Sequence, residues 1–456
     1  MAKDSNCVVW SPKMKKWAII SCGTLVVLAA TATYLSSCRR RRRFGLKEER
    51  TPGTKHKAGH ESGEIVEGPE CKPVGQKEMA RRASDHAAVG RWQRETGAAP
   101  LQSVSSPSVV EREPKKTGGG GGARERIQSI VSRYSGASQG GIAPHNPNKQ
   151  NQDALVMAMD RVTSSVFLAV LDGHGQAGRR VSQAFRMRLA EEVFNHPEWR
   201  TCCETAITES IAKIEAHVQA NIMIDTKSSG TTLVSACLRG TRLTVTNVGD
   251  SRAVLGRRLE LESGAGKDSS RTMLVAQRLT EDHKPDVQRE ERRILAAGGR
   301  VFAVSYRDDY GPPRVWHADR DEPGLAMSRS LGDSDAEVAG VISESDVFRY
   351  DLAEGKGCAD GDGAGPGREA AEAARGEPEV LILASDGLWD VFSDQEAVDV
   401  ASRYVDLGEA TSTLVKQARK RWLRQEKMVD DITVCIARFK TRSKWPQFEG
   451  AAATQG

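Results

Sequence analysis

The fold class that the sequence predicts is α+β, a β-sandwich with helices, and two features of residues 126–440 predict it. Apolar strand-like runs occur in clusters, and segments with helical periodicity occur in pairs. A doubly wound parallel sheet would instead require strands and helices in strict alternation. The predicted strands are residues 166–171, 231–238, 243–247, 254–256, 380–384 and 432–439, and the predicted helices are residues 177–194, 205–221, 287–297, 394–404 and 410–426.

The rest of the chain differs from this domain in composition. Residues 38–125 are rich in Gly, Glu, Lys, Ser and Pro and have almost no apolar periodicity, which predicts a disordered tether. We expect the other parts to be a short tail at 1–16, an apolar span at 17–37, surface loop insertions near 260–271 and 353–377, and a flexible C-terminal tail at 441–456.

The apolar span at 17–37 contains 21 residues without a charge. As a helix it would cover about 31 Å, close to the bilayer core of about 30 Å. A cleaved signal peptide and a buried helix are the alternatives, but the sixteen-residue polar lead before the span and the arginines at 39–43 disfavour cleavage. The heavier basic flank follows the span, so we expect a single-pass membrane anchor with the catalytic domain in the cytosol.

Charge and cysteine content exclude several function classes. Residues 1–124 carry 23 Lys and Arg against 12 Asp and Glu, whereas the remainder carries 43 against 49. The basic block lies beside the apolar span, which membrane topology or anionic lipid explains, so no nucleic-acid partner is expected. Nine cysteines without a C-x-x-C pair argue against a disulfide framework or a zinc site and favour a reducing compartment.

Aspartates lie where the predicted strands end, close to glycines. Asp172, Asp250 and Asp386 follow apolar strands, and Asp430 and Asp431 begin the last one. A single Asp-Gly pair is usually a turn. Four such acids at the rims of sheets have a common explanation, a binuclear site for Mg²⁺ or Mn²⁺, because these ions take oxygen ligands and need only a few carboxylates. Two such ions can hold a phosphate for in-line displacement.

An ordered series of motifs along the chain carries a specific resemblance to a known family. The motifs are FLAVLDGHGQAG, SSGTTLVSACL, LTVTNVGDSRAVL, LTEDHKP, RILAAGGRV, GLAMSRSLGD, LILASDGLWDV and VDDITV. The series resembles the metal-dependent serine/threonine protein phosphatases of the 2C type, in a variant like that of plants and protists, and it covers roughly residues 127–440. The resemblance implies two antiparallel sheets flanked by antiparallel helix pairs, a monomeric catalytic domain, and metal ions in a cleft at one end of the sandwich.

The resemblance also implies the metal ligands. Asp172 matches the carboxylate that bridges both ions, and Gly173 the residue that supplies a backbone carbonyl. Asp386 and Asp430 match the remaining ligands of the first ion, and Asp250 matches an aspartate that helps to hold a third, weaker ion. The implied cofactor is therefore Mg²⁺ or Mn²⁺, as two ions with a third weaker one.

Three further positions concern catalysis and substrate. His174 matches the general acid that protonates the leaving serine or threonine oxygen, which suits a side chain that titrates near neutrality; a solvent-facing loop histidine is the alternative. Gln152 stands where many members have Glu, and no arginine precedes it, so Lys149 is the candidate to hold substrate phosphate as a point charge. Asp431 stands where many members have Asn and is expected to support the ligands rather than bind an ion.

The expected function is Mg/Mn-dependent hydrolysis of phosphoserine and phosphothreonine in proteins. A metal-bridging hydroxide would attack phosphorus without a phosphoenzyme, and the lack of a C-x₅-R loop agrees with this. Residues 301–323 match the family's variable flap, where Arg300, Arg307 and Arg314 either meet an acidic phosphosubstrate or are solvated charges. A membrane-tethered pseudophosphatase that binds phosphoproteins without turnover is the rival, supported by Gln152 and the missing arginine.

Overall fold

The computed structural model describes residues 102–103, 111–112 and 129–446, except residues 145, 147–148, 262–270, 307–308, 354–355, 359–375 and 426–427. The predicted membrane span at 17–37 and most of the predicted tether lie outside the described residues. Within the described part of the chain, no helix is long and apolar enough to cross a bilayer.

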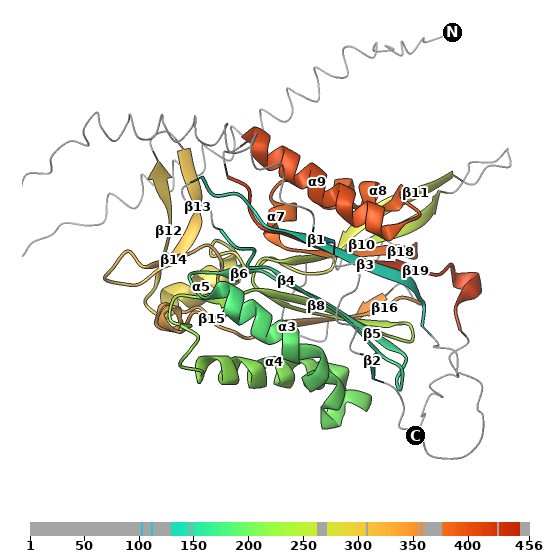
Figure 1. The fold of residues 1–456 in the computed structure, drawn as a ribbon, viewed down its shortest axis with the longest axis horizontal. Helices are drawn as coiled ribbons and strands as arrows, with labels where there is room; N and C mark the ends of the chain where they lie inside the picture. The colour runs from blue at the N-terminus through green and yellow to red at the C-terminus, as the bar shows by residue number, and fades with distance from the viewer. Residues whose placement is uncertain are drawn as a thin grey trace, which may run out of the picture. The chain divides into compact units, whose positions relative to one another are not determined.

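Two β-sheets stack face to face, and helices cover both outer faces (Figure 1). The strands within each sheet pair antiparallel, except that β2 runs parallel to β4. The first sheet has the order β1 (Gln102–Ser103), β3 (Val131–Gln139), β19 (Ile432–Phe439), β18 (Glu377–Ala384), β10 (Arg252–Leu261), β11 (Arg271–Arg278). The second has the order β17 (Lys356–Cys358), β16 (Asp346–Asp351), β9 (Arg242–Val248), β8 (Leu233–Arg239), β5 (Ser165–Leu171), β4 (Ala154–Asp160), β2 (Glu111–Arg112).

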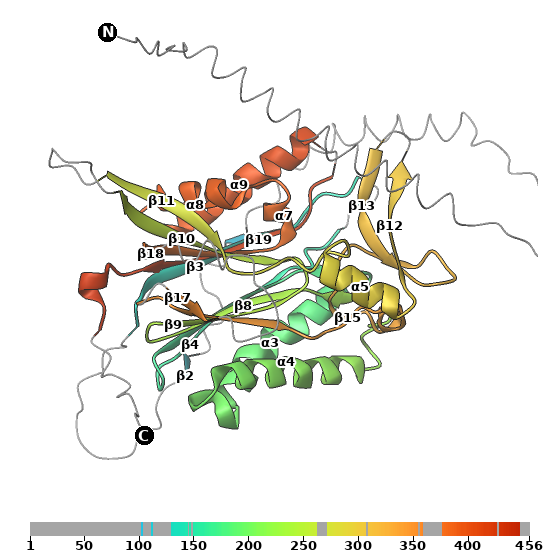
Figure 2. The same cartoon turned by 180° about the vertical axis from the view of Figure 1, so that it is seen from behind.

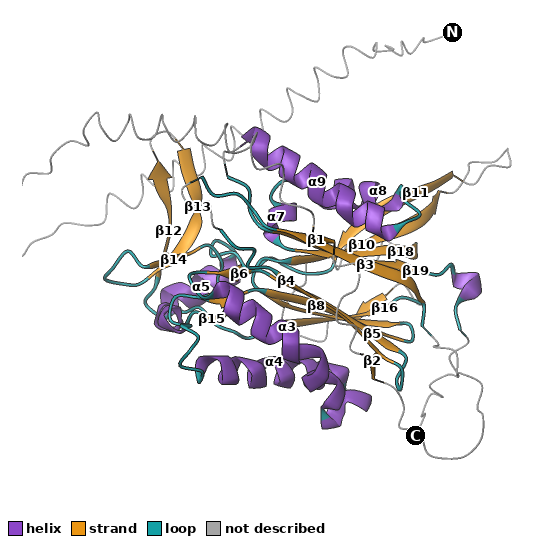
Figure 3. Cartoon of the chain, in the orientation of Figure 1, coloured by secondary structure: helices purple, strands orange, loops and turns teal. Residues whose placement is uncertain are grey.

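Most of the helices form the two outer layers, and α5 (Gln288–Ala296) lies at the end of the sandwich, as the view from behind also shows (Figure 2). Their bounds are α3 (Gly178–Asn195), α4 (Cys203–Gln219), α5 (Gln288–Ala296), α7 (Asp386–Trp389), α8 (Asp394–Ser402) and α9 (Leu407–Gln425), with 3₁₀ turns η1 (Pro197–Arg200), η2 (Ser334–Ala339) and η3 (Arg442–Lys444). The pair α3 and α4 packs on the seven-stranded sheet, and α7 to α9 pack on the six-stranded sheet (Figure 3). The predicted sandwich with flanking helix pairs is therefore confirmed.

Strand β5 explains why the sequence shows continuous apolar runs instead of alternation. All seven of its residues are buried. Val166, Leu168 and Val170 belong to the core between the two sheets, whereas Phe167 and Leu171 belong to the core under α3 and α4. Because both faces of the strand are covered by apolar layers, neither face needs polar side chains.

Two small sheets lie at the end of the sandwich where the strand-end aspartates gather. The first consists of β12 (Arg300–Tyr306), β13 (Asp309–Trp316) and β14 (Pro323–Leu325), in the segment predicted to be the flap. The second consists of β15 (Leu331–Gly332), β7 (Gly230–Thr231) and β6 (Gly173–His174), and it joins the 331–332 segment to the loop after β5.

The predicted boundaries need one correction. The stretch 260–271 was expected to be a loop insertion, but β10 continues to Leu261 and β11 begins at Arg271, and these two residues pair with each other. The insertion is thus the connection of a long β-hairpin. Residues 254–256 of β10 were predicted, but the rest of β10 and all of β11 were missed because charged residues dominate the sequence near the tip of the hairpin.

Candidate active site

The aspartates predicted to bind metal lie on connections at one end of the sandwich. Asp172 follows β5 directly, Asp250 lies between β9 and β10, Asp386 begins α7 two residues after β18 ends, and Asp430 precedes β19. Strands β18 and β19 are antiparallel neighbours, so the end of one lies beside the beginning of the other. The fold therefore gathers acids that are far apart in the sequence.

The carboxylates are close enough to perturb one another. Burial raises the pKa of Asp172 well above its ordinary value, and the charges of Asp153, Asp386 and Asp430 raise it further. Burial likewise raises the pKa of Asp386, with Asp250 and Asp430 adding to the effect. Clusters of buried carboxylates that repel one another are typical of functional sites. The repulsion destabilises the fold unless a bound cation offsets it.

A glycine allows the segment that carries Asp386 to approach the segment that carries Asp430 and Asp431. A Cβ atom on Gly387, next to Asp386, would lie 2.0 Å from the backbone oxygen of Asp431. Gly173 is similarly confined, since a Cβ there would lie 2.6 Å from the backbone oxygen of Gln152. Both glycines are therefore required for close packing of backbone around the carboxylates.

The carboxylates outnumber the cations that face them. The electrostatically linked acids are Asp153, Asp172, Asp250, Asp386, Asp390, Asp430 and Asp431, and the cations that act on them are Lys149, Lys284 and, on Asp390, Arg252. Three oxygens, Oδ1 of Asp153, of Asp250 and of Asp386, are buried and have no hydrogen-bond partner among the residues that the structure describes. Unsatisfied buried carboxylate oxygens are costly unless a cation binds them, so the residues present fit divalent metal ions.

The lysines occupy two sides of this cluster. Lys149 Nζ lies 2.8 Å from Asp431 Oδ1 and 3.3 Å from Asp430 Oδ1. Burial lowers its pKa, but the two carboxylates outweigh burial, so the net pKa is raised. Lys284 donates to Asp250, and Asp386 also stabilises its charge. Lys149, predicted to meet substrate phosphate, thus contacts the carboxylates in this structure.

His174 is held by a carboxylate that the motif series did not single out. Its Nε2 lies 2.5 Å from Oδ2 of Asp333, which is only 2% exposed. Burial lowers the pKa of His174, but Asp333 outweighs burial and the net pKa is raised, which favours the protonated ring. Nδ1 is buried and has no hydrogen-bond partner of ordinary geometry in the described part of the chain.

Comparison with known proteins identifies the family. The family model described as Protein phosphatase 2C matches residues 141–427. The chain belongs to the protein phosphatase 2C family. It is 33% identical over 301 residues to "Probable protein phosphatase 2C 64" of Oryza sativa subsp. japonica, a match that covers 63% of this chain and 62% of that protein. With "Probable protein phosphatase 2C 35" of Arabidopsis thaliana it shares 30% identity over 330 residues, covering 68% of this chain and 84% of the relative.

The fold of this phosphatase also resembles a solved structure. "Crystal structure of serine-threonine phosphatase 2C from Toxoplasma gondii" superposes with a TM-score of 0.50 at 21% identity, covering 68% of this chain and 96% of that one. The predicted membership, in a plant-like variant, is thereby confirmed, and it places the chain among the metal-dependent protein serine/threonine phosphatases.

The departures from the family pattern have structural roles. Asp431 is buried and accepts hydrogen bonds from the backbone N–H of Gly141 at 2.6 Å and of Gln152 at 2.9 Å, so it fixes the strand start rather than facing an open site. The side chain of Gln152 donates to the backbone oxygen of Gly175 at 2.7 Å. The position of the expected Glu thus ties the loop after β5 to β4.

Three functional candidates escaped prediction: Asp333, Lys284 and Asp390. The first two lie in quoted motifs, GLAMSRSLGD and LTEDHKP, and Asp390 lies in LILASDGLWDV, so their motifs were the available signal. Their partners lie at long sequence separation; His174 and Asp333 are 159 positions apart.

The arginines predicted to lie in the flap stand apart from this cluster. Arg300 pairs with Asp321 at 2.9 Å and Arg314 donates to the backbone of Gly324 at 2.6 Å, so both support the flap; Arg307 lies outside the described residues.

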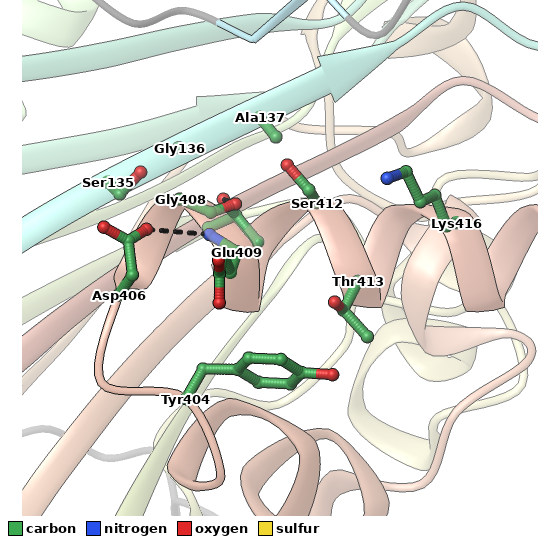
Figure 4. A pocket seen from close by; sticks show the side chains of 11 residues that line it. Ser135, Gly136, Ala137, Tyr404, Asp406, Gly408, Glu409, Ser412, Thr413 and Lys416 are labelled. Carbon is green, nitrogen blue, oxygen red and sulfur yellow. Dashed lines mark hydrogen bonds between the residues drawn. The ribbon is translucent and has the colours of Figure 1, made fainter.

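A hollow of about 480 Å³ lies between β3 and α9, lined by polar side chains that include Asp406, Glu409 and Lys416 (Figure 4). None of the predicted site residues lines it. Within the described residues no group of three or more His, Cys, Asp or Glu side chains stands in ready metal-site geometry.

Proposed function

We propose that this phosphatase hydrolyses phosphoserine and phosphothreonine in proteins and requires Mg²⁺ or Mn²⁺. The observation that carries the proposal is the cluster of mutually repelling carboxylates, with unpartnered buried oxygens on Asp250 and Asp386, beside the His174–Asp333 pair. An acid-rich cluster beside a protonated histidine suits hydrolysis of a phosphate ester, in which a metal offsets negative charge and an acid protonates the leaving group.

The carboxylates of Asp172, Asp386 and Asp430 and the backbone carbonyl of Gly173 would hold two ions, and Asp250 would help to hold a third. When bound, the ions supply positive charge opposite the phosphoryl oxygens and activate the attacking water. Asp431 and Gln152 keep these ligands in place through their hydrogen bonds to backbone atoms. Water attacks phosphorus directly, so no phosphoenzyme forms.

His174 supplies the proton for the leaving oxygen. Asp333 accepts the Nε2 proton and stabilises the charged ring. This leaves Nδ1 as the atom that carries the transferable proton, and a hydrogen bond to the backbone of Asp172 also favours the protonated ring. The pair thus combines a positioned acid with a carboxylate that fixes its orientation.

Lys149 is proposed to contact substrate phosphate when the metals are bound. Its ammonium group lies between Asp430 and Asp431. Divalent ions on Asp430 would repel the ammonium, and the long flexible stem of lysine allows the group to reach a nearby anion.

Turnover of matched peptides tests the proposal. The full-length chain should release phosphate from phosphothreonine and phosphoserine peptides with Mn²⁺ or Mg²⁺, release little from a phosphotyrosine peptide, and release none in excess chelator. Acid-quenched protein should carry no labelled phosphate during turnover. Equal turnover with chelator would contradict the metal requirement, and tight metal binding without any turnover would favour the pseudophosphatase instead.

We also propose that residues 17–37 anchor the enzyme in a membrane with the catalytic domain in the cytosol. The uncharged run and the heavier basic flank after it support this. A protein tagged at its C-terminus should stay in membranes after alkaline carbonate washing and lose its tag to protease once the plasma membrane alone is permeabilised. Release by carbonate would contradict the anchor, and a protected tag would contradict the orientation.

A further inference from the structure

We propose that Cys203 and Cys237 form an oxidisable thiol pair, in which Cys203 reacts with a peroxide and Cys237 closes a disulfide with it. The pair lies under α4 on the seven-stranded sheet. The carboxylates of the candidate active site lie elsewhere, and the proposal stands independently of the phosphatase activity. The proposal assigns a modification site to two cysteines that take no part in phosphate hydrolysis.

The strand register places the two thiols together. In the antiparallel pair β8–β9, Cys237 lies directly opposite Thr244. Directly opposite residues project from the same face of a sheet, with Cβ atoms about 4.5–5.5 Å apart. Cys203, the first residue of α4, brings its Sγ to 3.4 Å from Thr244 Oγ1. Its thiol therefore lies over the Cys237–Thr244 pair, close enough to Cys237 for each thiol to shift the pKa of the other.

Burial differs between the two cysteines in the way a reactive pair requires. Cys237 is 1% exposed and belongs to the core formed by α3, α4 and the outer face of the sheet. Cys203 packs against that core but is only partly buried. A small oxidant in solvent can therefore reach Cys203 first, while Cys237 remains protected until its neighbour has reacted.

Electrostatics give the two thiols different roles. The hydrogen bond from Cys237 is the main reason that the pKa of Cys203 is lowered to about 7; burial opposes the shift, and Thr244 supports it. The charge of Arg239 also favours the thiolate, whereas Glu204 disfavours it. The pKa of Cys237 is raised well above its ordinary value, because its proton is shared with Cys203 and because it is buried. Cys203 is the nucleophile, and its place at a helix N-terminus adds to this.

The chemistry balances with hydrogen peroxide as the oxidant. The Cys203 thiolate attacks one peroxide oxygen, the O–O bond breaks, and with one proton the products are a Cys203 sulfenic acid and water. The sulfur of Cys237 then displaces the sulfenic oxygen, its proton leaves with that oxygen as a second water, and the S–S bond forms. The two sulfurs lose two electrons together, and the peroxide gains them.

Neighbouring cysteines supply matched controls. Cys202 is adjacent in sequence and also partly buried, but its thiol donates to Glu204 at 3.3 Å and accepts from Thr205 at 3.1 Å. Cys435 is fully buried in β19 on the other sheet, and burial raises its pKa to about 12. Neither is expected to react at a peroxide concentration that oxidises Cys203.

Peptide mapping of the full-length chain tests the proposal. After brief peroxide treatment and alkylation of free thiols, the wild-type chain should yield a linked peptide that joins Cys203 to Cys237, at least tenfold more abundant than any link through Cys202 or Cys435. Reduction with dithiothreitol should abolish it. Cys202→Ser should leave the yield unchanged.

The variants separate the two steps. Cys237→Ser should form no link but should accumulate a Cys203 sulfenic acid that a cyclic diketone traps, and Cys203→Ser should form neither product. Circular dichroism spectra and Mn²⁺-dependent turnover should match wild type in both reduced variants, which shows that they are folded. Free Cys203 and Cys237 after treatment, or a dominant link between Cys202 and Cys203, would overturn the proposal.

Discussion

Glu290 offers a quantitative test of how the segment that carries Asp333 is held. Its side chain is fully buried and accepts hydrogen bonds from Arg329 at 2.7 Å, from Arg293 at 2.7 Å and from Ser328 at 2.7 Å. Burial alone would raise its pKa, but Arg329 and Ser328 outweigh burial and lower it from 4.5 to about 2. At about 1.4 kcal/mol for each tenfold change, this corresponds to about 3 kcal/mol of stability.

The perturbation is Glu290→Gln, which keeps the shape of the side chain and removes its charge. We expect the free energy of unfolding at pH 7 to fall by about 3 kcal/mol, since the buried Arg329 loses one of its two carboxylate partners and keeps only Asp346. The folded-state pKa of Glu290 lies below its unfolded value, so its stabilisation is complete above about pH 4.5 and is lost as the pH falls toward 2. Wild type should therefore approach the variant in stability across that range.

The assay is urea unfolding followed by tryptophan fluorescence at several pH values. Glu396→Gln is the matched control, because Glu396 also pairs with an arginine, Arg421, at 3.0 Å and has a similarly lowered pKa of about 2, for which Arg421 is the main cause. Its side chain is 50% exposed, so water screens the pair and we expect a loss below about 1 kcal/mol. Equal losses in the two variants would refute the reasoning from burial.

Three further predictions concern the active site. Asp333→Asn should lower kcat roughly 100-fold with little change in KM, because His174 loses the charge that holds its proton; steady-state kinetics on a phosphothreonine peptide measure this, and an unchanged kcat would contradict it. Gly387→Ala should destabilise the fold by roughly 2 kcal/mol and weaken Mn²⁺ binding, since the added Cβ would lie 2.0 Å from a backbone oxygen. Thermal melting measures the first effect and calorimetry the second. In the control Gly311→Ala the nearest contact of the added Cβ is 3.6 Å away, so neither quantity should change. Lys149→Met should tighten Mn²⁺ binding in calorimetry, because a competing ammonium is removed, and should raise KM for the phosphopeptide; weaker metal binding would count against the proposed competition.

The sequence predicted the central strands well because both of their faces are buried. Strands β5, β8, β18 and β19 each contain a predominantly apolar stretch that the sequence analysis identified. Strand β3 was missed because its sequence, VSRYSGASQ, is largely polar. Its position depends on the pairing with β19, in which Gly136 lies opposite Cys435, and such a long-range register leaves no local pattern.

The candidate site likewise contains residues that the sequence predicted and partners that it did not. Asp172, Asp386 and His174 carry motif signals that place them at the site, and the fold brings them together. The partners of these residues were not predictable, because Asp333 reaches His174 from a segment 159 positions away. For Lys149 too, the residue was predicted but its partners were not. The sequence could not indicate that Asp430 and Asp431 would hold its ammonium group.

Metal binding and turnover measured on the same sample test the central claim most directly. Mn²⁺ is titrated by calorimetry into the full-length chain, into Asp172→Asn and into Asp225→Asn, an exposed aspartate outside the cluster, and phosphothreonine-peptide hydrolysis is measured alongside. We predict that wild type and Asp225→Asn bind Mn²⁺ and turn over alike, while Asp172→Asn keeps its circular dichroism spectrum, binds Mn²⁺ at least tenfold more weakly and loses turnover. Equal metal affinity and equal turnover in Asp172→Asn would contradict a metal-dependent phosphatase centred on this carboxylate.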